Sequence, residues 1–228
     1  YGVFTSYNKL LESGFDGYYG SFFKVKDWKN SKEMYKDITF SLNEVKKFPD
    51  KKSVIGSFTT HDEVSPIILK GPEFSDMIIW LSATLPVNSY FVDGFQTGDD
   101  YAYKMGNKLA PSSNTDDDMY FTHRGKIDIF NLSRKPMGKY DGLKNSFLLG
   151  NDVKKSVLPI LNEGVFTPLK TNHNEVFAYM FSNNIKKVIT IGNLDFENPK
   201  KTVVKVPKFN PKRQNVLPIK ITSMPDVK

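Results

Sequence analysis

Residues 53–63 read SVIGSFTTHDE, and this stretch decides the class of fold that the sequence predicts. Its first eight residues, Ser53 to Thr60, combine β-branched, aromatic and small side chains, which predicts a short buried strand. Three polar side chains follow at once, His61, Asp62 and Glu63. Functional groups collect at the carboxyl ends of the strands in parallel βα architectures, so this order favours such a fold.

The segments on either side repeat an alternation of strand and helix. An aromatic run with closely spaced glycines predicts a short strand over residues 15–23, and apolar residues at spacings of three and four predict a helix over 32–47. Further along the chain, residues 73–85 predict a mostly apolar helix and residues 89–92 a third strand. The order strand, helix, strand, helix, strand predicts parallel βα units and therefore an α/β fold.

Ionisable residues lie at the ends of all three predicted strands. They are Asp16, then the triplet His61, Asp62 and Glu63, then Asp93. Such side chains can converge on one pocket, and carboxylates with a histidine suit sugar chemistry: acids transfer protons and stabilise positive charge at the anomeric carbon, while histidine bonds hydroxyls. Taken alone, such a triplet is more often an ordinary polar turn than part of a site.

Residues 95–140 predict a long irregular segment. The acids Asp99 and Asp100, and the run at 116–118, can bind calcium through their oxygens, or they can be solvated loop acids. Tyr101 and Tyr103 are candidates for stacking on sugar rings. A structural calcium ion is the one cofactor that these residues suggest.

The last third of the chain changes its periodicity. Residues 141–161 predict a helix, with a break near Gly150. Beyond Gly164 apolar residues recur with a period of two, which predicts strands over 175–181, 187–192, 202–206 and 216–222. We therefore expect a small antiparallel β domain at the carboxyl end.

Composition restricts the function further. The 228 residues include no cysteine, which excludes a disulfide framework, a thiolate zinc site and a cysteine nucleophile, and leaves the cellular compartment open. No apolar run approaches the roughly 18 residues of a membrane span. Residues 162–228 hold 11 Lys and Arg against 5 Asp and Glu, so a module that binds nucleic acid is one reading. The lysines come as isolated pairs without an arginine cluster, which favours a solvated basic face and no nucleic-acid partner.

Several motifs together resemble the alpha-amylase family. Residues 58–62, Phe-Thr-Thr-His-Asp, resemble the Phe-x-x-Asn-His-Asp motif that closes strand seven of that family's barrel. Residues 83–86 and 90–94 resemble its segment around strand eight, and residues 157–164 resemble the end of its last barrel helix. Residues 176–179 and 188–194 are similar to strands of its C-terminal β domain. The resemblance covers nearly the whole chain, in the family's order.

The resemblance implies a fold of the class α/β plus all-β. Residues 1–161 would be the last three βα units, strands six to eight, of a partial (β/α)8 TIM barrel, and residues 162–228 a small antiparallel β-sandwich domain. The implied activity is retaining hydrolysis or transfer on α-linked glucans. The family's nucleophilic Asp, in a Gly-x-Arg-x-Asp pattern, and its general acid Glu have no match here. We therefore expect both in a missing N-terminal barrel half of the same protein, and we expect this chain alone to be inactive.

The resemblance also implies roles for single residues. Asp62 matches the carboxylate that stabilises the oxocarbenium-like transition state, and His61 the histidine that bonds sugar hydroxyls; Asp93 and Tyr101 are further candidates for contact with the substrate. Thr60 stands where the family has Asn, and Val87 where it has Gly. These departures leave an alternative open, a non-catalytic carbohydrate-binding or interaction protein on the same fold.

Overall fold

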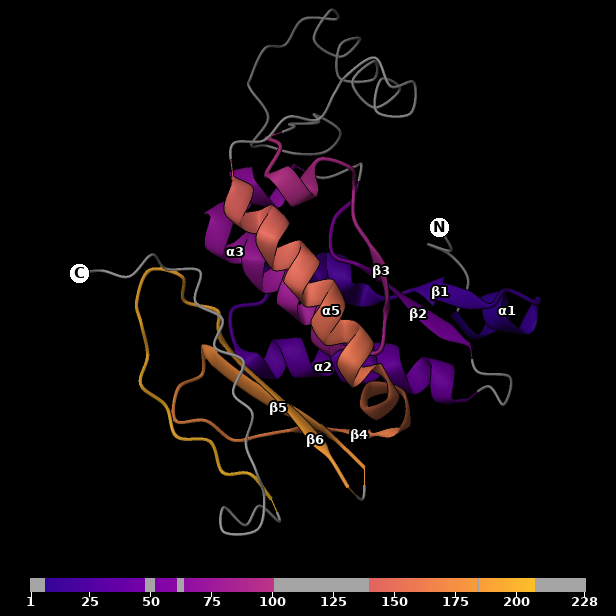
Figure 1. Cartoon of the computed structure of the whole chain (residues 1–228). Coiled ribbons are helices and arrows are strands. Elements are labelled where there is room, and N and C mark those ends of the chain that lie inside the picture. The colour runs from indigo at the N-terminus through magenta and orange to yellow at the C-terminus, as the bar shows by residue number, and fades with distance from the viewer. Residues whose placement is uncertain (1–6, 48–51, 61–63, 101–139, 184, 208–228) are drawn as a thin grey trace, which may run out of the picture.

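The computed structural model describes residues 7–47, 52–60, 64–100, 140–183 and 185–207. Its elements, in chain order, are α1 (Tyr7–Glu12), β1 (Gly17–Tyr19), the 3-10 helix η1 (Ser21–Asp27), α2 (Ser31–Lys46), β2 (Ser53–Ser57), α3 (Pro66–Thr84), β3 (Asn88–Tyr90), the 3-10 helix η2 (Phe95–Thr97), α5 (Asp141–Glu163), β4 (Val165–Pro168), β5 (Val176–Ser182) and β6 (Lys187–Asn193). Figure 1 shows helices α2, α3 and α5 between two small sheets. No helix within these ranges is long and apolar enough to cross a bilayer.

The first sheet is parallel, with strand order β1-β2-β3, as the βα alternation predicted. One face of this sheet packs on the helices: Tyr18 and Val54 are 2% and 1% exposed and belong to the main core. Side chains alternate along a strand, so Tyr19, Ile55 and Tyr90 lie on the opposite face. That face is less covered, since Tyr19 and Ile55 are half-buried and Tyr90 is 40% exposed. We call this side of the sheet the open face.

Helix α2 forms where the sequence predicted it. The Asn30 side chain accepts a hydrogen bond from the backbone N–H of Glu33 at 3.0 Å and thereby caps the first turn. The apolar positions Met34, Ile38 and Leu42 are buried, as their spacing requires. The first predicted strand is shorter than expected, because the chain leaves β1 after Tyr19 and turns into η1.

Helices α3 and α5 differ from the prediction, α3 in its start and α5 in its continuity. Helix α3 begins at Pro66, seven residues before the predicted start. It kinks at Gly71, which has a φ of 83° and directly precedes Pro72. The predicted break of α5 near Gly150 is wrong, because the helix continues from Asp141 to Glu163. A Cβ atom at Gly150 would lie 3.1 Å from Cγ2 of Ile79, so this glycine permits close approach of α5 to α3 rather than a break.

The second sheet is antiparallel, with strand order β4-β5-β6. Its strands β5 and β6 match the two predictions over 175–181 and 187–192, whereas β4 was not predicted. The predicted strand at 202–206 is wrong. This segment carries no strand; instead Val204 and Val206 pack on a small apolar cluster of Leu169, Ala178 and Met180. The strand predicted at 216–222 lies outside the described residues.

One hydrophobic core joins the two sheets. It contains Phe22, Met34 and Phe74 together with Phe177 and Tyr179 of β5. Polar contacts reinforce this junction. The Tyr179 hydroxyl lies 2.6 Å from Oγ1 of Thr84, and the Tyr35 hydroxyl donates to the backbone carbonyl of Ala178 at 2.7 Å. The division of the chain at residue 161 therefore stays a prediction, and core contacts cross it.

The packing of Gly192 against an aromatic ring makes a testable prediction. A Cβ atom at this position would lie 2.2 Å from the buried ring of Phe177 on the neighbouring strand. We expect Gly192→Ala to lower the free energy of unfolding by about 1–3 kcal/mol, because a packed core resists extra atoms. Gly142→Ala is the control, since no atom lies within 4 Å of its Cβ position. Equal denaturation midpoints for the two variants would contradict this account.

Candidate functional site

The carboxyl ends of β2 and β3 lie together, as a parallel sheet requires. Thr59 and Thr60 follow β2, and both are buried. The Thr59 hydroxyl accepts a hydrogen bond from the backbone N–H of Val92 at 2.8 Å, which ties the two strand ends to each other. His61 and Asp62 come next in the chain but lie outside the described residues, so their predicted roles stay predictions.

Asp93 lies three residues beyond β3, at the same edge of the sheet, and is exposed. Its Oδ1 accepts hydrogen bonds from the backbone N–H of Gly94 at 2.9 Å and from Nε2 of Gln96 at 3.0 Å. Gly94 has φ 94°, which allows the sharp turn into η2. The Asp93 carboxylate is thus fixed by its neighbours through one oxygen, and the described residues offer no hydrogen bond to the other oxygen.

Gln96 belongs to this turn and was not predicted. Its side chain bridges the turn, since Oε1 accepts from the backbone N–H of Gly94 at 3.1 Å while Nε2 donates to Asp93. A single Gln in a loop carries no motif, so nothing in the sequence indicated its position.

The third strand-end residue, Asp16, is not part of this arrangement. The sequence analysis placed it with Asp62 and Asp93, but it precedes β1, and its carbonyl accepts from the backbone N–H of Ser53 at the start of β2. It therefore lies at the amino ends of the strands, opposite Asp93. The error arose because the aromatic run at 15–23 was expected to form one strand, whereas β1 covers only Gly17–Tyr19.

The remaining site predictions concern the segment after η2. Asp99 is 1% exposed and its backbone N–H donates to the carbonyl of Gly94 at 2.9 Å, whereas Asp100 is exposed. Tyr101 and the acidic run at 116–118 lie outside the described residues. Within the described ranges, no three His, Asp or Glu side chains are grouped so that they could hold a metal ion. The calcium prediction stays a prediction.

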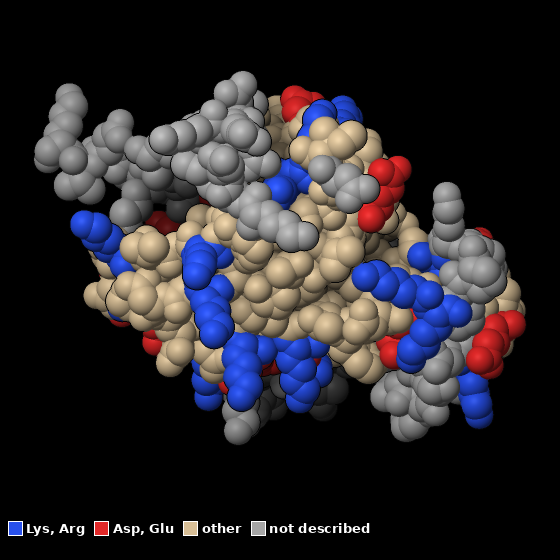
Figure 2. Space-filling model, turned by 90° about the horizontal axis from the view of Figure 1, so that it is seen from below, with Lys and Arg blue, Asp and Glu red and all other residues tan. Residues whose placement is uncertain are grey.

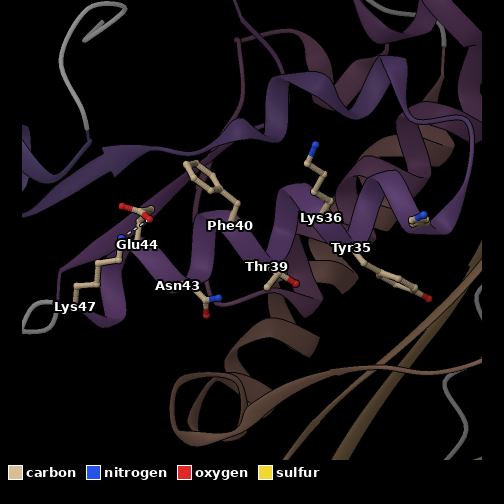
Figure 3. A pocket seen from close by; sticks show the side chains of 8 residues that line it. Tyr35, Lys36, Thr39, Phe40, Asn43, Glu44 and Lys47 are labelled. Atoms are coloured by element: carbon tan, nitrogen blue, oxygen red, sulfur yellow. Dashed lines mark hydrogen bonds and ion pairs between the residues drawn. The ribbon is translucent and has the colours of Figure 1, made fainter.

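Two hollows are found in the described part of the chain, one away from the strand ends and one very small void beside them. A shallow groove of about 610 Å³ runs along the outer side of α2, and Figure 3 shows its lining: Lys32, Tyr35, Lys36, Thr39, Phe40, Asn43, Glu44 and Lys47. Seven of these residues belong to α2, and the eighth, Lys47, is its C-cap and pairs with Glu44 at 2.6 Å. A void of about 10 Å³ beside Thr59 and Thr60 has room for about one water molecule. The groove has one carboxylate in its lining, that of Glu44, and not the acid pair of a glycosidase centre, and the void is far too small for a sugar.

The face seen from below carries Lys and Arg side chains in more than one place among the described residues (Figure 2). Figure 2 shows Lys and Arg side chains at several places around a central area of other residues. The expectation of no nucleic-acid partner stays a prediction.

Comparisons with known proteins agree with this fold. No protein-family model matches the chain, and no curated protein matches it. Among solved structures, an alpha-amylase from H. orenii matches with a TM-score of 0.53 and 12% identity, over 84% of this chain and 42% of that one. Amy13B of Eubacterium rectale matches with a TM-score of 0.50 and 17% identity, over 83% of this chain and 41% of that one.

The described chain therefore has an alpha-amylase-type fold, mixed α/β with one parallel and one antiparallel sheet. The resemblance to the alpha-amylase family in the sequence is confirmed at the level of the fold. The chain spans less than half of the length of the two solved structures that it matches.

The turn at Asp93 allows the structural contribution of the carboxylate oxygen to be separated from that of its negative charge. Asp93→Asn keeps an oxygen that can accept from Gly94 and Gln96, so we expect the thermal midpoint to stay within error. Asp93→Ala removes that oxygen, and we expect a loss of about 0.5–2 kcal/mol, as for other lost turn caps. Chemical denaturation of both variants tests this. An Asn variant as unstable as the Ala variant would mean that the negative charge itself holds the turn.

Proposed function

We propose that this chain is part of an alpha-amylase-like retaining glycoside hydrolase or transglycosylase that acts on α-linked glucans. The observation that carries the proposal is the juxtaposition of two strand ends, Thr59-Thr60 and Asp93, at the carboxyl edge of a parallel sheet in an alpha-amylase-type fold. Active sites of barrel enzymes lie at this edge. The polar residues that the sequence supplies next, His61 and Asp62, then belong to the substrate site.

The proposed chemistry needs three acids, of which this chain supplies one. In a retaining mechanism a carboxylate attacks the anomeric carbon while a carboxylic acid protonates the departing glycosidic oxygen. Both groups are expected upstream of Tyr1. Asp62 would stabilise the positive charge that develops on the sugar ring, and His61 would bond its hydroxyls. Asp93 and Tyr101 would contact the substrate further out.

The same proposal assigns each of the two parts of the chain to a domain. Residues 1–161 form strands six to eight of a (β/α)8 barrel with their helices, and residues 162–228 form a C-terminal antiparallel β-sandwich domain. Three strands cannot close a barrel, so the remaining strands come from the missing N-terminal half. The less covered side of the β1-β2-β3 sheet supports this assignment, because parallel sheets are normally covered on both faces.

A non-catalytic carbohydrate-binding protein on the same fold is the second candidate. Thr60 supports it, because the family's Asn at this position would supply an amide donor beside His61 that threonine lacks. Under this alternative the glucan still binds at the carboxyl edge of the sheet, but no bond is cleaved.

The two candidates differ in turnover. The protein that contains this chain and the residues encoded before it is incubated with α-1,4-linked maltooligosaccharides and, as a control, with β-linked cellooligosaccharides. We expect cleavage or transfer of the α-linked series alone, with retention of anomeric configuration by NMR. Binding without turnover supports the carbohydrate-binding alternative, and neither binding nor turnover contradicts both.

A further inference from the structure

The turn that follows β3 rests on an aromatic stack. The ring of Phe95 is 1% exposed and lies against that of Phe91, with centroids 4.8 Å and planes 16° apart. Phe91 also meets the ring of Phe147 in α5 edge-on, with centroids 5.1 Å apart. The backbone N–H and the hydroxyl of Thr97 both donate to the carbonyl of Gly94, at 3.1 and 3.0 Å. The turn is therefore held in place, and polar side chains on it are positioned before a ligand arrives.

The side chains of Asp93 and Gln96 form one polar unit on this turn. Nε2 of Gln96 donates to Oδ1 of Asp93 at 3.0 Å, and Oε1 of Gln96 accepts from the backbone N–H of Gly94 at 3.1 Å. These bonds leave one carboxylate oxygen and one amide hydrogen over, and no group in the described part of the chain bonds to either. Asp93 is exposed and Gln96 is half-buried, so the unit offers a ligand one acceptor directly beside one donor.

An acceptor beside a donor suits two neighbouring hydroxyls of a sugar. Because a hydroxyl both donates and accepts, one hydroxyl can donate to Oδ2 of Asp93 while its neighbour accepts from Nε2 of Gln96. Each internal glucose unit of an α-1,4-linked glucan has one such pair of free hydroxyls, at carbons 2 and 3. Its 6-hydroxyl stands alone.

We infer that Asp93 and Gln96 together bind the 2- and 3-hydroxyls of one glucose unit, with Asp93 as the acceptor and Gln96 as the donor. The inference rests on the proposed function, which supplies the α-linked glucan as the ligand. It adds a residue that the sequence did not indicate, Gln96, and it names the sugar hydroxyls that the turn recognises. The pair takes no part in bond cleavage, so its loss should raise KM and leave kcat nearly unchanged.

Deoxygenated substrates separate this contact from a structural role of the turn. The protein that contains this chain and the residues encoded before it is given maltotetraosides in which a single glucose unit lacks its 2-, 3- or 6-hydroxyl. Affinity is measured as KM where the substrate turns over, and as Kd by calorimetry where it is only bound. A site built to bond a hydroxyl discriminates against an analogue that lacks it, because its own polar group is then left unpaired.

Two variants identify the partner of each hydroxyl. Asp93→Asn keeps an oxygen for the turn and replaces the free acceptor by an amide, and Gln96→Met removes the donor but keeps the length of the side chain. At one glucose unit we expect the native protein to lose affinity about tenfold without the hydroxyl bound by Asp93, and about threefold without the one bound by Gln96. Asp93→Asn should abolish the first loss and Gln96→Met the second.

The outcomes separate the inference from the proposed function. A turn that is merely distorted would weaken binding of every analogue alike, and native losses retained in Asp93→Asn would overturn the inference even if Gln96→Met does not fold. Turnover with no such coupling leaves the proposed enzyme standing, and coupling in Kd without turnover leaves the diol contact standing. A native protein that neither binds nor cleaves the glucan overturns both. Asn43→Ala is the control that should retain all losses, because Asn43 carries an exposed amide on the outer side of α2.

Discussion

Under the proposed function, replacement of Asp62 by Asn in the protein that contains this chain and the residues encoded before it is expected to lower kcat on α-1,4-linked glucans by roughly 10²–10³-fold. The proposal gives this carboxylate the task of balancing the positive charge that develops at the anomeric carbon, and an amide cannot balance that charge. The thermal midpoint should stay within error, because the substitution changes charge while it nearly preserves shape. Steady-state kinetics and thermal unfolding of the same preparation measure both effects.

The neighbouring acid supplies the control for that prediction. Glu63 follows Asp62 directly but has no role in the family's motif. Glu63→Gln should therefore leave kcat within about twofold, a change of less than half a kcal/mol. If Asp62→Asn and Glu63→Gln had equal and small effects on kcat, the assignment of Asp62 to the transition state would be wrong.

Replacement of Lys154 by Met is expected to cost about 3 kcal/mol of stability. Lys154 comes from α5, and its Nζ donates to the backbone carbonyls of Ser82, Leu85 and Val87 at 2.6, 2.9 and 2.7 Å. These carbonyls end α3 and open the turn into β3, where the helix itself provides no partners. Met keeps the aliphatic stem but leaves the carbonyls unpaired. Urea denaturation of the present chain tests the expectation.

The same residue predicts a dependence on pH. Burial lowers the pKa of Lys154 to about 8, from an ordinary value of 10.5. Between these values the unfolded chain binds the proton that the folded chain has released, so Lys154 makes stability rise as pH increases from about 8 to 10.5. The stability gap between the native chain and Lys154→Met should widen over that window. Lys155→Met is the control, because Lys155 is exposed and pairs with the exposed Asp152 at 3.6 Å. The same widening in both variants would exclude Lys154 as the cause.

Local patterns predicted the elements whose own residues determine them. The helix α2 was predicted from its apolar stripe, because the residues that form this stripe all lie within the helix itself. The parallel order of β1, β2 and β3 was predicted because helices separate the strands, and this connection favours parallel pairing. The strands β5 and β6 were predicted from their period of two.

Contacts between distant segments explain most of the failures. Gly150 looked like a helix break, but its place against Ile79 of α3 makes a small residue favourable inside the helix. Residues 202–206 have the alternation of a strand, yet the side chain of Asn172 accepts from the hydroxyl of Thr202 and the N–H of Val203 and holds the segment as irregular chain. Neither contact leaves a signal in the local sequence.

The candidate site was predictable only in part for the same reason. Asp93 was predicted from its position after a strand, and it does lie at the carboxyl edge beside the end of β2. Its partner Gln96 and the buried Lys154 carry no motif, since their roles depend on backbone groups that folding brings near. The error at Asp16 arose because β1 contains only three residues, so a small error in its predicted bounds moves a residue from one end of the strand to the other.

The most direct test of the central proposal is the sequence of the reading frame that encodes the residues before Tyr1. If the chain is the back part of an alpha-amylase-like enzyme, the frame continues for on the order of 200 residues and contains a Gly-x-Arg-x-Asp motif, followed by a Glu at the end of a later strand. A frame that begins at Tyr1, or that continues without these two acids, would contradict the enzyme and leave the carbohydrate-binding alternative.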